Sequence, residues 1–389
     1  MKQVLAWALY DLANTFFAVG MLSFYFPLWL VEEQGQKEIV FSAALAISTI
    51  CVALLMPFCG AVSDAAGERM RFLRWTTYGC VLATAAIAWT PGVPAALLLF
   101  GVANVCYQLG TVFYDALLWK LVPDERLGPT SGVGASFGYL GSALGLLLLW
   151  PFVSRGGHAA AFTPTALYFL VFALPSFALI REPRQPRPLP LRVALRAAWM
   201  RLVVTFRAAR SYTGLWRFFW ASFFSLNAIN TVLVFMGVYT KRVLGFSEYE
   251  VIRFFVFSQL FAVAGSVILT RRIPRWGAKR VLAWIWTGWL GALVLIAAGA
   301  GGPWLWVAGP AIGFCLGATW ATSRVLVMEL APKDQLAEMF GLAGLFGRAA
   351  SVVGPLLWGL IVLDPSRYRH AVMALILLLA VGLWLLRRV

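Results

Sequence analysis

Residues 60–71 read Gly-Ala-Val-Ser-Asp-Ala-Ala-Gly-Glu-Arg-Met-Arg and separate two long apolar segments of the chain. The two glycines of this stretch, Gly60 and Gly67, permit a tight turn. Asp64 and Arg69 of this stretch are placed to hold neighbouring helix ends in one conformation. The pattern therefore predicts two apolar helices joined by a short charged loop that acts as a conformational lock.

Apolar segments of this kind recur along the whole chain. A helix that crosses the ~30 Å hydrocarbon core of a bilayer needs about 20 apolar residues. Twelve segments have this length, at about 4–31, 40–63, 72–91, 94–121, 131–153, 163–181, 217–240, 250–270, 281–301, 303–330, 338–363 and 369–386. The sequence thus predicts an all-α polytopic membrane protein with twelve transmembrane helices.

One polar stretch divides the twelve segments into two groups of six. We expect an N-terminal half at 1–181, a cytoplasmic linker at 182–216 and a C-terminal half at 217–389. The linker opens with a proline-rich piece, and its remaining residues have the arginine and apolar spacing of an amphipathic helix. Such a helix is predicted to lie on the membrane surface.

The composition agrees with this class of protein. Of the 389 residues, 61% are apolar and 12% are charged, which leaves too little polar surface for a soluble enzyme of this size. The net charge of +16 comes from a shortage of acids, 16 against 32 bases, so no nucleic-acid partner is expected. We find no catalytic constellation, no metal-ligand spacing and no nucleotide-binding loop, and we predict neither an enzyme nor a cofactor.

The basic residues predict the orientation in the membrane. Loops on one side of the twelve segments hold 23 Lys and Arg residues, and loops on the other side hold seven. Cytoplasmic loops collect basic residues. Both termini are therefore predicted to be cytoplasmic, in a multi-pass protein of the inner (cytoplasmic) cell membrane.

The two halves also form an internal repeat. At an offset of 209 residues, Leu121–Asp124 aligns with Leu330–Lys333. The glycines that follow align in the same way: Gly132 with Gly341, Gly138 with Gly347 and Gly145 with Gly354. Two six-helix halves in parallel repeat describe the major facilitator architecture, in which substrate binds near the midplane between the halves.

Several motifs carry a resemblance to known families. The stretch at 60–71 resembles the signature loop of the major facilitator superfamily. Three further regions resemble the vacuolar amino-acid effluxers linked to fungal autophagy, and more closely their bacterial relatives: Trp7–Thr15, Phe113–Leu117 with Ser131–Gly141, and Ser323–Arg324 with Phe340–Gly341 and Gly354–Pro355. The resemblance implies solute export, with amino acids as the first substrate expected. The chain departs from the family at Asp115, where Asn is usual, and at Leu118–Trp119, where Leu-Pro is usual.

Polar residues inside the predicted helices are the candidate site. A charged side chain at the centre of a membrane helix costs roughly 2.5–3.5 kcal/mol, so such residues usually face the interior of the bundle. Four charged residues have this position, and Asp11 and Asp115 among them are candidate proton carriers. The set that we expect to bind substrate or proton is Asp11, Asn14, Asn104, Gln108, Asp115, Asn227, Asn230, Trp320, Arg324 and Arg348.

Helical spacing groups these candidates. Asn104, Gln108, Thr111 and Asp115 share one helix face, which indicates either a wall of a water-filled cavity or a polar seam between helices. Asp11 and Asn14 share a face of the first helix, as Asn227 and Asn230 do on the seventh. Trp320 and Arg324 share a face of the tenth helix. Arg348 is placed to bind an anionic group of the substrate or to form an internal salt bridge.

We therefore expect a secondary active transporter that moves a small polar solute by alternating access, with export of amino acids and coupling to protons. The alternatives are multidrug efflux, or a receptor or lipid-handling protein on the same fold. The expected partners are a small-molecule substrate, a coupling proton and the lipid bilayer, and the protein is expected to be a monomer.

Overall fold

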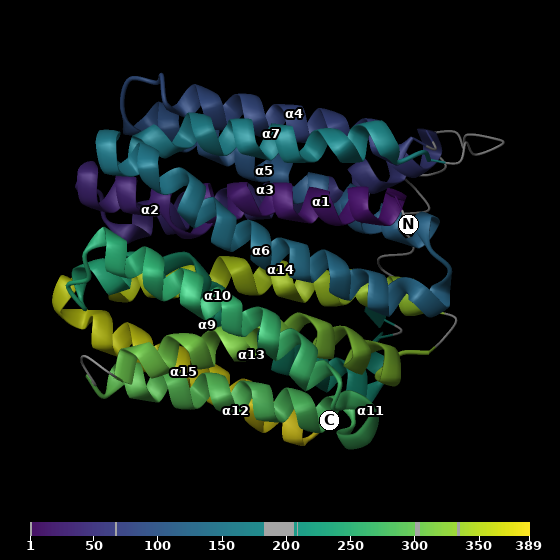
Figure 1. Cartoon of the computed structure of the whole chain (residues 1–389). Helices are drawn as coiled ribbons and strands as arrows, with labels where there is room; N and C mark the ends of the chain where they lie inside the picture. The colour runs from purple at the N-terminus through teal and green to yellow at the C-terminus, as the bar shows by residue number, and fades with distance from the viewer. Residues whose placement is uncertain (1, 67, 183–205, 208, 300–303, 333–334) are drawn as a thin grey trace. The chain divides into compact units, whose positions relative to one another are not determined.

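The computed structural model describes residues 2–66, 68–182, 206–207, 209–299, 304–332 and 335–389, and all regular elements within them are helical. The chain divides into two compact units, Met1–Arg201 and Leu202–Val389. Most of the predicted linker and its amphipathic helix, at 182–216, lies outside the described residues. Figure 1 shows the helices of each unit running along a common direction.

The described residues of the N-terminal unit form six long helical segments. The first consists of four consecutive pieces, which are α1 (Lys2–Phe17), η1 (Ala18–Ser23), α2 (Tyr25–Leu28) and η2 (Trp29–Glu33). The others are α3 (Glu38–Ala66), α4 (Arg69–Ile87), α5 (Val93–Leu121), α6 (Asp124–Gly156) and, after η3 (His158–Ala161), α7 (Phe162–Leu179).

The C-terminal unit contains six more. They are α9 (Thr213–Arg242), α10 (Glu248–Thr270), then, after the short α11 (Ile273–Trp276), α12 (Ala278–Ala297), α13 (Leu305–Leu330), α14 (Leu336–Ile361) and, after η6 (Pro365–Arg367), α15 (Tyr368–Arg387). The all-α prediction is confirmed. The helices begin and end within a few residues of the predicted segments, apart from α6, which begins seven residues early.

Eleven of these segments are long and apolar enough to cross a membrane by length and composition, among the residues described. The twelfth is α4, which occupies the place of the predicted segment 72–91. Its first two turns carry Arg69, Arg71 and Arg74, and these three charges lower its mean hydropathy. The helix nevertheless packs against α5 and α7 inside the N-terminal unit.

The first segment is not the single continuous helix that the apolar run at 4–31 predicted. Phe24 interrupts it with φ −137° and ψ −78°, and wide π-helical turns lie on both sides. Pro27 has no N–H to donate to the carbonyl of Ser23, so the regular hydrogen-bond ladder cannot pass this point. Interruptions of this kind are typical of proline in helices.

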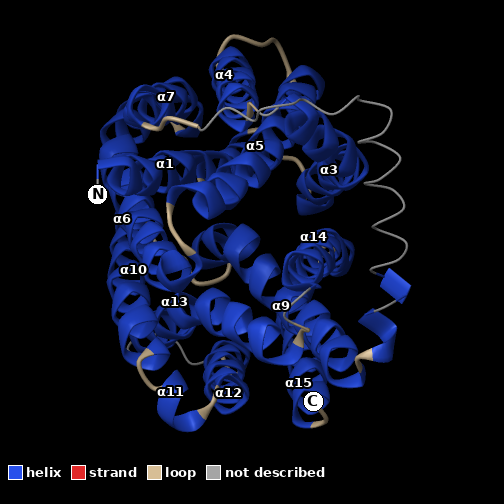
Figure 2. Ribbon diagram, turned by 90° about the vertical axis from the view of Figure 1, so that its right-hand side faces the viewer, coloured by secondary structure: helices blue, strands red, loops and turns tan. Residues whose placement is uncertain are grey.

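The same pattern of helix neighbours occurs in each unit. In the N-terminal unit α1 packs against α6 and α7, while α5 packs against α3 and α4. In the C-terminal unit α9 packs against α14 and α15, while α13 packs against α10 and α12. Figure 2 shows α1 beside α6 and α7 in a view along the helices. The internal repeat seen in the sequence therefore has a counterpart in the packing inside each unit.

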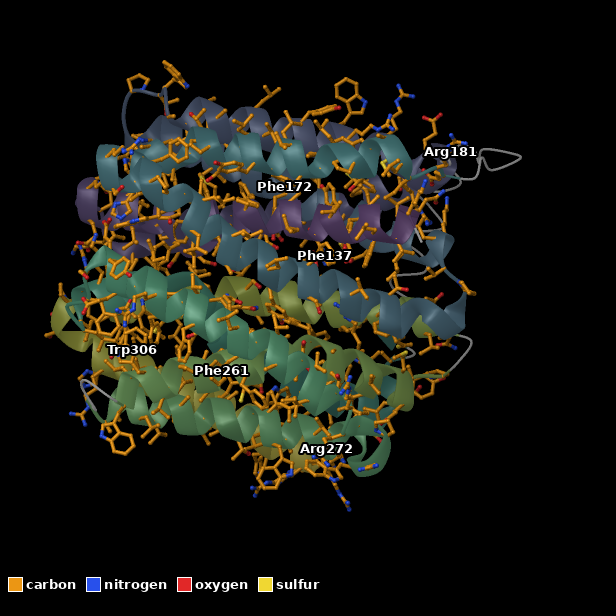
Figure 3. The ribbon with its side chains drawn as sticks, in the orientation of Figure 1. Phe137, Phe172, Arg181, Phe261, Arg272 and Trp306 are labelled. Atoms are coloured by element: carbon orange, nitrogen blue, oxygen red, sulfur yellow. The ribbon has the colours of Figure 1, made fainter. Side chains whose placement is uncertain are left out.

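Large apolar side chains cover much of the outside of the helices. Leu54, Leu82, Leu98 and Leu377 are each 66–72% exposed, and Figure 3 shows apolar side chains along the length of the helices. Contiguous apolar surface of this kind is rare on water-soluble monomers. Its place along the helix flanks is that of a surface in contact with lipid.

We call the end of each unit that is predicted to be cytoplasmic the inner end, and the opposite end the outer end. Arg69 and Lys120 lie at the inner end of the N-terminal unit. In the C-terminal unit Arg272 lies at the inner end and Trp306 at the outer end (Figure 3).

Glycines bring helix backbones into direct contact. The Cβ atom of an alanine at Gly141 of α6 would lie 2.5 Å from the carbonyl oxygen of Leu12 in α1. In the C-terminal unit Gly354 of α14 lies against the backbone of Asn227, and Gly313 of α13 lies against the backbone of Ser258. Such contacts are the usual means of helix association in lipid. Gly134, Gly138, Gly141 and Gly145 of α6 form a ridge of such contacts with the first helical segment.

We expect Gly141→Ala to destabilise the N-terminal unit by about 1–3 kcal/mol, the usual cost of inserting an extra carbon into a packed core. The new methyl group would meet backbone atoms of Leu12, which cannot rotate away. The control is Gly132→Ala on the same helix, where nothing lies within 4 Å of the new atom. The measurement is the thermal unfolding midpoint of the purified protein. Equal midpoints for the two variants would contradict the close contact.

Candidate functional site

The motifs Trp7–Thr15, Phe113–Leu117 and Ser131–Gly141 of the N-terminal unit meet around Trp7. The indole Nε1 of Trp7, on α1, donates a hydrogen bond to the backbone oxygen of Tyr114, on α5, at 3.1 Å. The two rings are stacked with centroids 4.5 Å apart. Gly134 of α6 lies against the face of the indole, where a Cβ atom would be 2.6 Å from the ring. Segments far apart in the sequence are thus joined at one point.

Asp11 lies one turn beyond Trp7 on α1. Its side chain is half-buried, and a Cβ atom at Gly138 of α6 would lie 2.9 Å from its Oδ2. Asp115 of α5 has an exposed side chain and directly follows Tyr114, whose ring stacks on Trp7. Both candidate carboxylates therefore belong to one neighbourhood inside the N-terminal unit.

Two neighbours of Asp11 complete this neighbourhood. Tyr10 is buried and its hydroxyl shares a 2.7 Å hydrogen bond with Thr77 of α4. Asn14 is only 4% exposed, and its Oδ1 has no hydrogen-bond partner among the described residues. A buried amide oxygen without a partner is energetically costly. The structure thus brings together Asp11, Asn14 and Asp115 from the predicted set.

The polar face of α5 divides into two parts. Asn104 is fully buried and donates to Ser48 of α3 at 2.7 Å, and Gln108 donates to Thr49 at 3.0 Å. These two residues form a polar seam between α3 and α5, which was the alternative interpretation of their spacing. Asp115, at the far end of the same face, is exposed.

The two asparagines of α9 differ in burial and in hydrogen-bond partner. Asn227 is fully buried, and its amide donates to the backbone oxygen of Phe223 one turn earlier at 2.7 Å. Asn230 is half-buried and donates to Ser351 of α14 at 2.8 Å. Both asparagines therefore take part in the contact between α9 and α14.

The remaining predicted site residues lie on α13 and α14. Trp320 is 37% exposed, and Arg324, one turn later on the same helix, is exposed as well. Arg348 of α14 is half-buried, with its Nη1 3.3 Å from the position of a Cβ atom at Gly344. The helices of the C-terminal unit thus carry two guanidinium groups from the predicted set.

The predicted lock at residues 60–71 is only partly as expected. Gly60 lies inside α3 and not in a turn, so the prediction of a tight turn at this glycine is wrong, because the helix continues to Ala66. Gly67 and the side chain of Asp64 lie outside the described part of the structure. Arg69 does join two helices, since its Nη1 donates to the backbone oxygen of Ala116 in α5 at 3.1 Å.

Comparison with known proteins identifies the family. The sequence pattern of the family described as "Vacuole effluxer Atg22 like" matches residues 34–389. The chain belongs to this family. Autophagy-related protein 22 of Yarrowia lipolytica is 24% identical over 339 residues, which cover 74% of this chain and 55% of that protein.

Further relatives and solved structures show the superfamily and the fold. The MFS-type transporter YxiO of Bacillus subtilis is 26% identical, with 99% of this chain and 94% of that protein covered. The crystal structure of the nucleoside transporter NupG superposes with a TM-score of 0.80 at 13% identity, covering 100% and 99% of the two chains. The human organic anion transporter MFSD10 superposes at 0.72 with 18% identity, covering 99% and 98%. The chain is a major facilitator transporter and not an enzyme.

Lys120 and Glu182, two residues that the sequence pattern alone did not single out, join helices at the inner end of the N-terminal unit. Glu182 follows α7, and its Oε2 accepts the backbone N–H of Met70 in the first turn of α4 at 2.9 Å. Its Oε1 accepts from Lys120 Nζ at the end of α5 at 2.6 Å, and the Glu182 side chain is only 8% exposed. A carboxylate at a helix N-terminus satisfies backbone donors and interacts favourably with the helix dipole. Glu182 therefore joins α4, α5 and α7 at the inner end.

A second contact supports the same junction. The Nη2 of Arg74, on α4, donates to the backbone oxygen of Phe177 in α7 at 2.5 Å. Its guanidinium carbon also lies 5.9 Å from the centre of the Phe177 ring. The sequence did contain a signal for the pair of Glu182 and Lys120. Glu182 directly follows one apolar segment and Lys120 lies at the end of another, and both ends are predicted to face the same side of the membrane.

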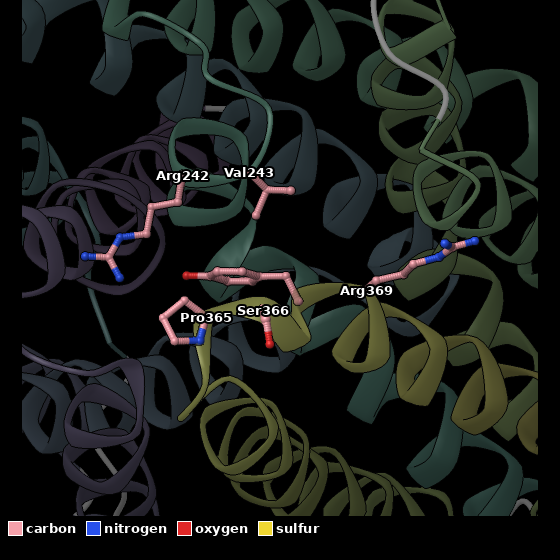
Figure 4. Close-up of a pocket in the computed structure, with 6 residues that line it drawn as sticks. Arg242, Val243, Pro365, Ser366 and Arg369 are labelled. Atoms are coloured by element: carbon pink, nitrogen blue, oxygen red, sulfur yellow. The ribbon is translucent and has the colours of Figure 1, made fainter.

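A pocket of about 630 Å³ lies elsewhere, at the outer end of the C-terminal unit. Figure 4 shows Arg242 and Arg369 beside it with their guanidinium groups pointing to opposite sides, so they do not converge on a ligand. The nearby Asp364 has its pKa lowered, because the backbone N–H and the hydroxyl of Ser366 both donate to its carboxylate. None of the predicted site residues lines this pocket.

We expect Glu182→Ala to destabilise the protein by on the order of 3 kcal/mol, because it leaves Lys120 without its partner in a largely buried position. The control is Glu68→Ala, which removes an exposed ion pair with Arg71 and should change stability by no more than about 0.5 kcal/mol. The thermal unfolding midpoints of the two purified variants provide the comparison. A Glu182 variant as stable as the Glu68 variant would show that the junction contributes nothing.

Proposed function

We propose that this transporter exports small zwitterionic solutes, with amino acids as the first candidates, by proton-coupled alternating access. The observation that carries the proposal is the placement of Asp11 and Asp115 beside the stacked rings of Trp7 and Tyr114 in the N-terminal unit. A half-buried carboxylate inside a membrane helix is costly while charged, and such residues typically mark proton relays and ion pathways.

The substrate class follows from the signs of the charges. The N-terminal unit offers Asp11 and Asp115, which suit an ammonium group. The C-terminal unit offers Arg324 and Arg348, and guanidinium groups bind carboxylates with two parallel hydrogen bonds. Charges of both signs inside the predicted helices support a solute that carries both an amine and a carboxylate.

The direction of transport is inferred from the family. The matched family is described as a vacuole effluxer, and vacuolar efflux moves solutes out of a compartment. By analogy with that description, taken as movement out of the compartment that the membrane encloses, we propose export from the cell. The excess of basic residues at the inner ends supports a cytoplasmic location for both termini.

The direct test of the substrate is counterflow. Purified protein in proteoliposomes preloaded with a mixture of unlabelled amino acids should accumulate labelled amino acids from outside, and liposomes without protein should not. The same assay with a panel of cationic drugs and of nucleosides tests whether the protein transports these other classes of solute. Counterflow of drugs without counterflow of amino acids would replace the proposed substrate class.

We expect Asp11→Asn to abolish accumulation driven by a proton gradient and to leave amino-acid exchange largely intact, because an amide cannot release a proton. Asp115→Asn is tested in parallel, since either carboxylate is a candidate carrier. The matched control is Asp364→Asn, an exposed carboxylate in an outer loop, which should keep both activities. Gradient-driven transport with unchanged pH dependence in both site variants would remove the proton from the mechanism.

For the orientation, reporter fusions after residue 200 and at the C-terminus should both be cytoplasmic, and a fusion after residue 155 should be external. The physical reason is the distribution of Lys and Arg, with 23 on one side and seven on the other. The measurement is the activity of a reporter enzyme that functions on one side of the membrane. An external C-terminus would contradict the orientation and require an odd number of spans.

A further inference from the structure

Basic side chains from three helices converge at the inner end of α15. Arg217, at the start of α9, donates through Nη1 to the backbone oxygen of Arg388 at 2.9 Å. Lys279, at the start of α12, donates through Nζ to the backbone oxygen of Arg387 at 3.3 Å. The side chains of Arg387 and Arg388 extend from the same turn and are exposed. We call Arg217, Lys279, Arg387 and Arg388 the basic cluster.

Little negative charge lies close to this cluster. The segments 206–217, 271–280 and 384–389 that form this end contain ten Arg and Lys residues and no Asp or Glu. Glu329, near the end of α13, forms no ion pair with the cluster in the part of the chain that the structure describes. The carbonyls at the end of a helix supply the equivalent of about half a negative charge. Among the contacts described, the cations that reach this end from α9 and α12 therefore meet only the partial charge of these carbonyls.

Tryptophans place the cluster at the level of lipid headgroups. Trp384 of α15 is 49% exposed, and the guanidinium of Arg388 lies 3.7 Å from the centre of its ring. Trp276 of α11 is 44% exposed, with Arg272 5.4 Å from its ring centre; Figure 3 shows Arg272 at this end of the unit. Exposed tryptophans gather where the hydrocarbon core meets the headgroups.

We propose that the basic cluster is a binding site for the phosphate headgroup of an anionic phospholipid in the inner leaflet. Arginine is suited to two-point contact with phosphate, and lysine adds a compact charge. One headgroup at this position contacts α9, α12 and α15 together. The rule that basic residues collect on the cytoplasmic side explains why cations are present, but it does not explain why side chains from separate helices meet at one helix end.

The lipid is favoured over a free phosphate ion by the surroundings of the cluster. The tryptophans and the apolar flank of α15, where Leu377 is 66% exposed, provide a surface for acyl chains. A soluble anion would use the charges alone. Anionic headgroups are also concentrated at the cytoplasmic surface, which attracts clustered Lys and Arg.

The test uses the purified full chain in a neutral detergent. Dioleoyl phosphatidylglycerol is titrated in, and the thermal unfolding midpoint is followed by tryptophan fluorescence. We expect a saturable rise of several degrees in the native protein and a much smaller rise with dioleoyl phosphatidylcholine. The double variant Arg217→Gln/Lys279→Gln should lose at least half of the rise.

The matched control is Arg253→Gln/Arg369→Gln, which removes two charges from exposed residues at the outer end of the same unit and should keep the full rise. Arg217→Lys/Lys279→Arg retains the charges and should keep most of it, which separates loss of charge from loss of folding. An equal loss in the inner and outer double variants, or no rise in the native protein, would overturn the proposal. A rise of the same size with inorganic phosphate alone would overturn the assignment to lipid.

Discussion

The hydrocarbon core of a bilayer offers no hydrogen-bond partner to the protein backbone, and the rest of this structure depends on that constraint. Every described segment of the predicted spans is helical because a helix satisfies its own N–H and C=O groups. Lipid also provides little hydrophobic drive for helices to associate, so association depends on close packing. Gly141 against Leu12, and Gly354 against Asn227, let backbones touch directly, and these contacts join the first and fifth helices of each unit.

The same constraint determines what a polar side chain inside a span can do. An uncharged amide that finds a hydroxyl on the next helix becomes part of the packing, as Asn104 does with Ser48 and Asn230 does with Ser351. A charged group cannot be satisfied so simply and stays where water or a second charge can reach it. Asp115 and Arg324 are exposed in the structure. The uncharged amides and the charged groups inside the predicted spans therefore differ in their surroundings.

The sequence was sufficient to predict the twelve segments and the repeat, because length and periodicity depend on neighbours along the chain. It could not predict the break at Phe24, where the effect of Pro27 depends on how the preceding turn widens. Nor could helical spacing decide between cavity and seam for Asn104 and Gln108, because Ser48 and Thr49 lie more than fifty residues earlier. Glu182 was missed for the same reason, since Met70 is 112 positions away in the sequence. In each case the decisive partner belongs to another helix.

The two units share one packing pattern but neutralise the charges of their inner ends differently. In the N-terminal unit two inner-end cations are paired with carboxylates: Lys120 with Glu182, and Arg71 with Glu68. In the C-terminal unit Arg217 and Lys279 donate only to the last carbonyls of α15, among the contacts described. A carbonyl carries a partial charge and cannot balance a full one. The inner end of the N-terminal unit therefore supplies carboxylates for some of its cations. The inner end of the C-terminal unit keeps an excess of positive charge that its surroundings must balance, although both ends derive from the same repeat.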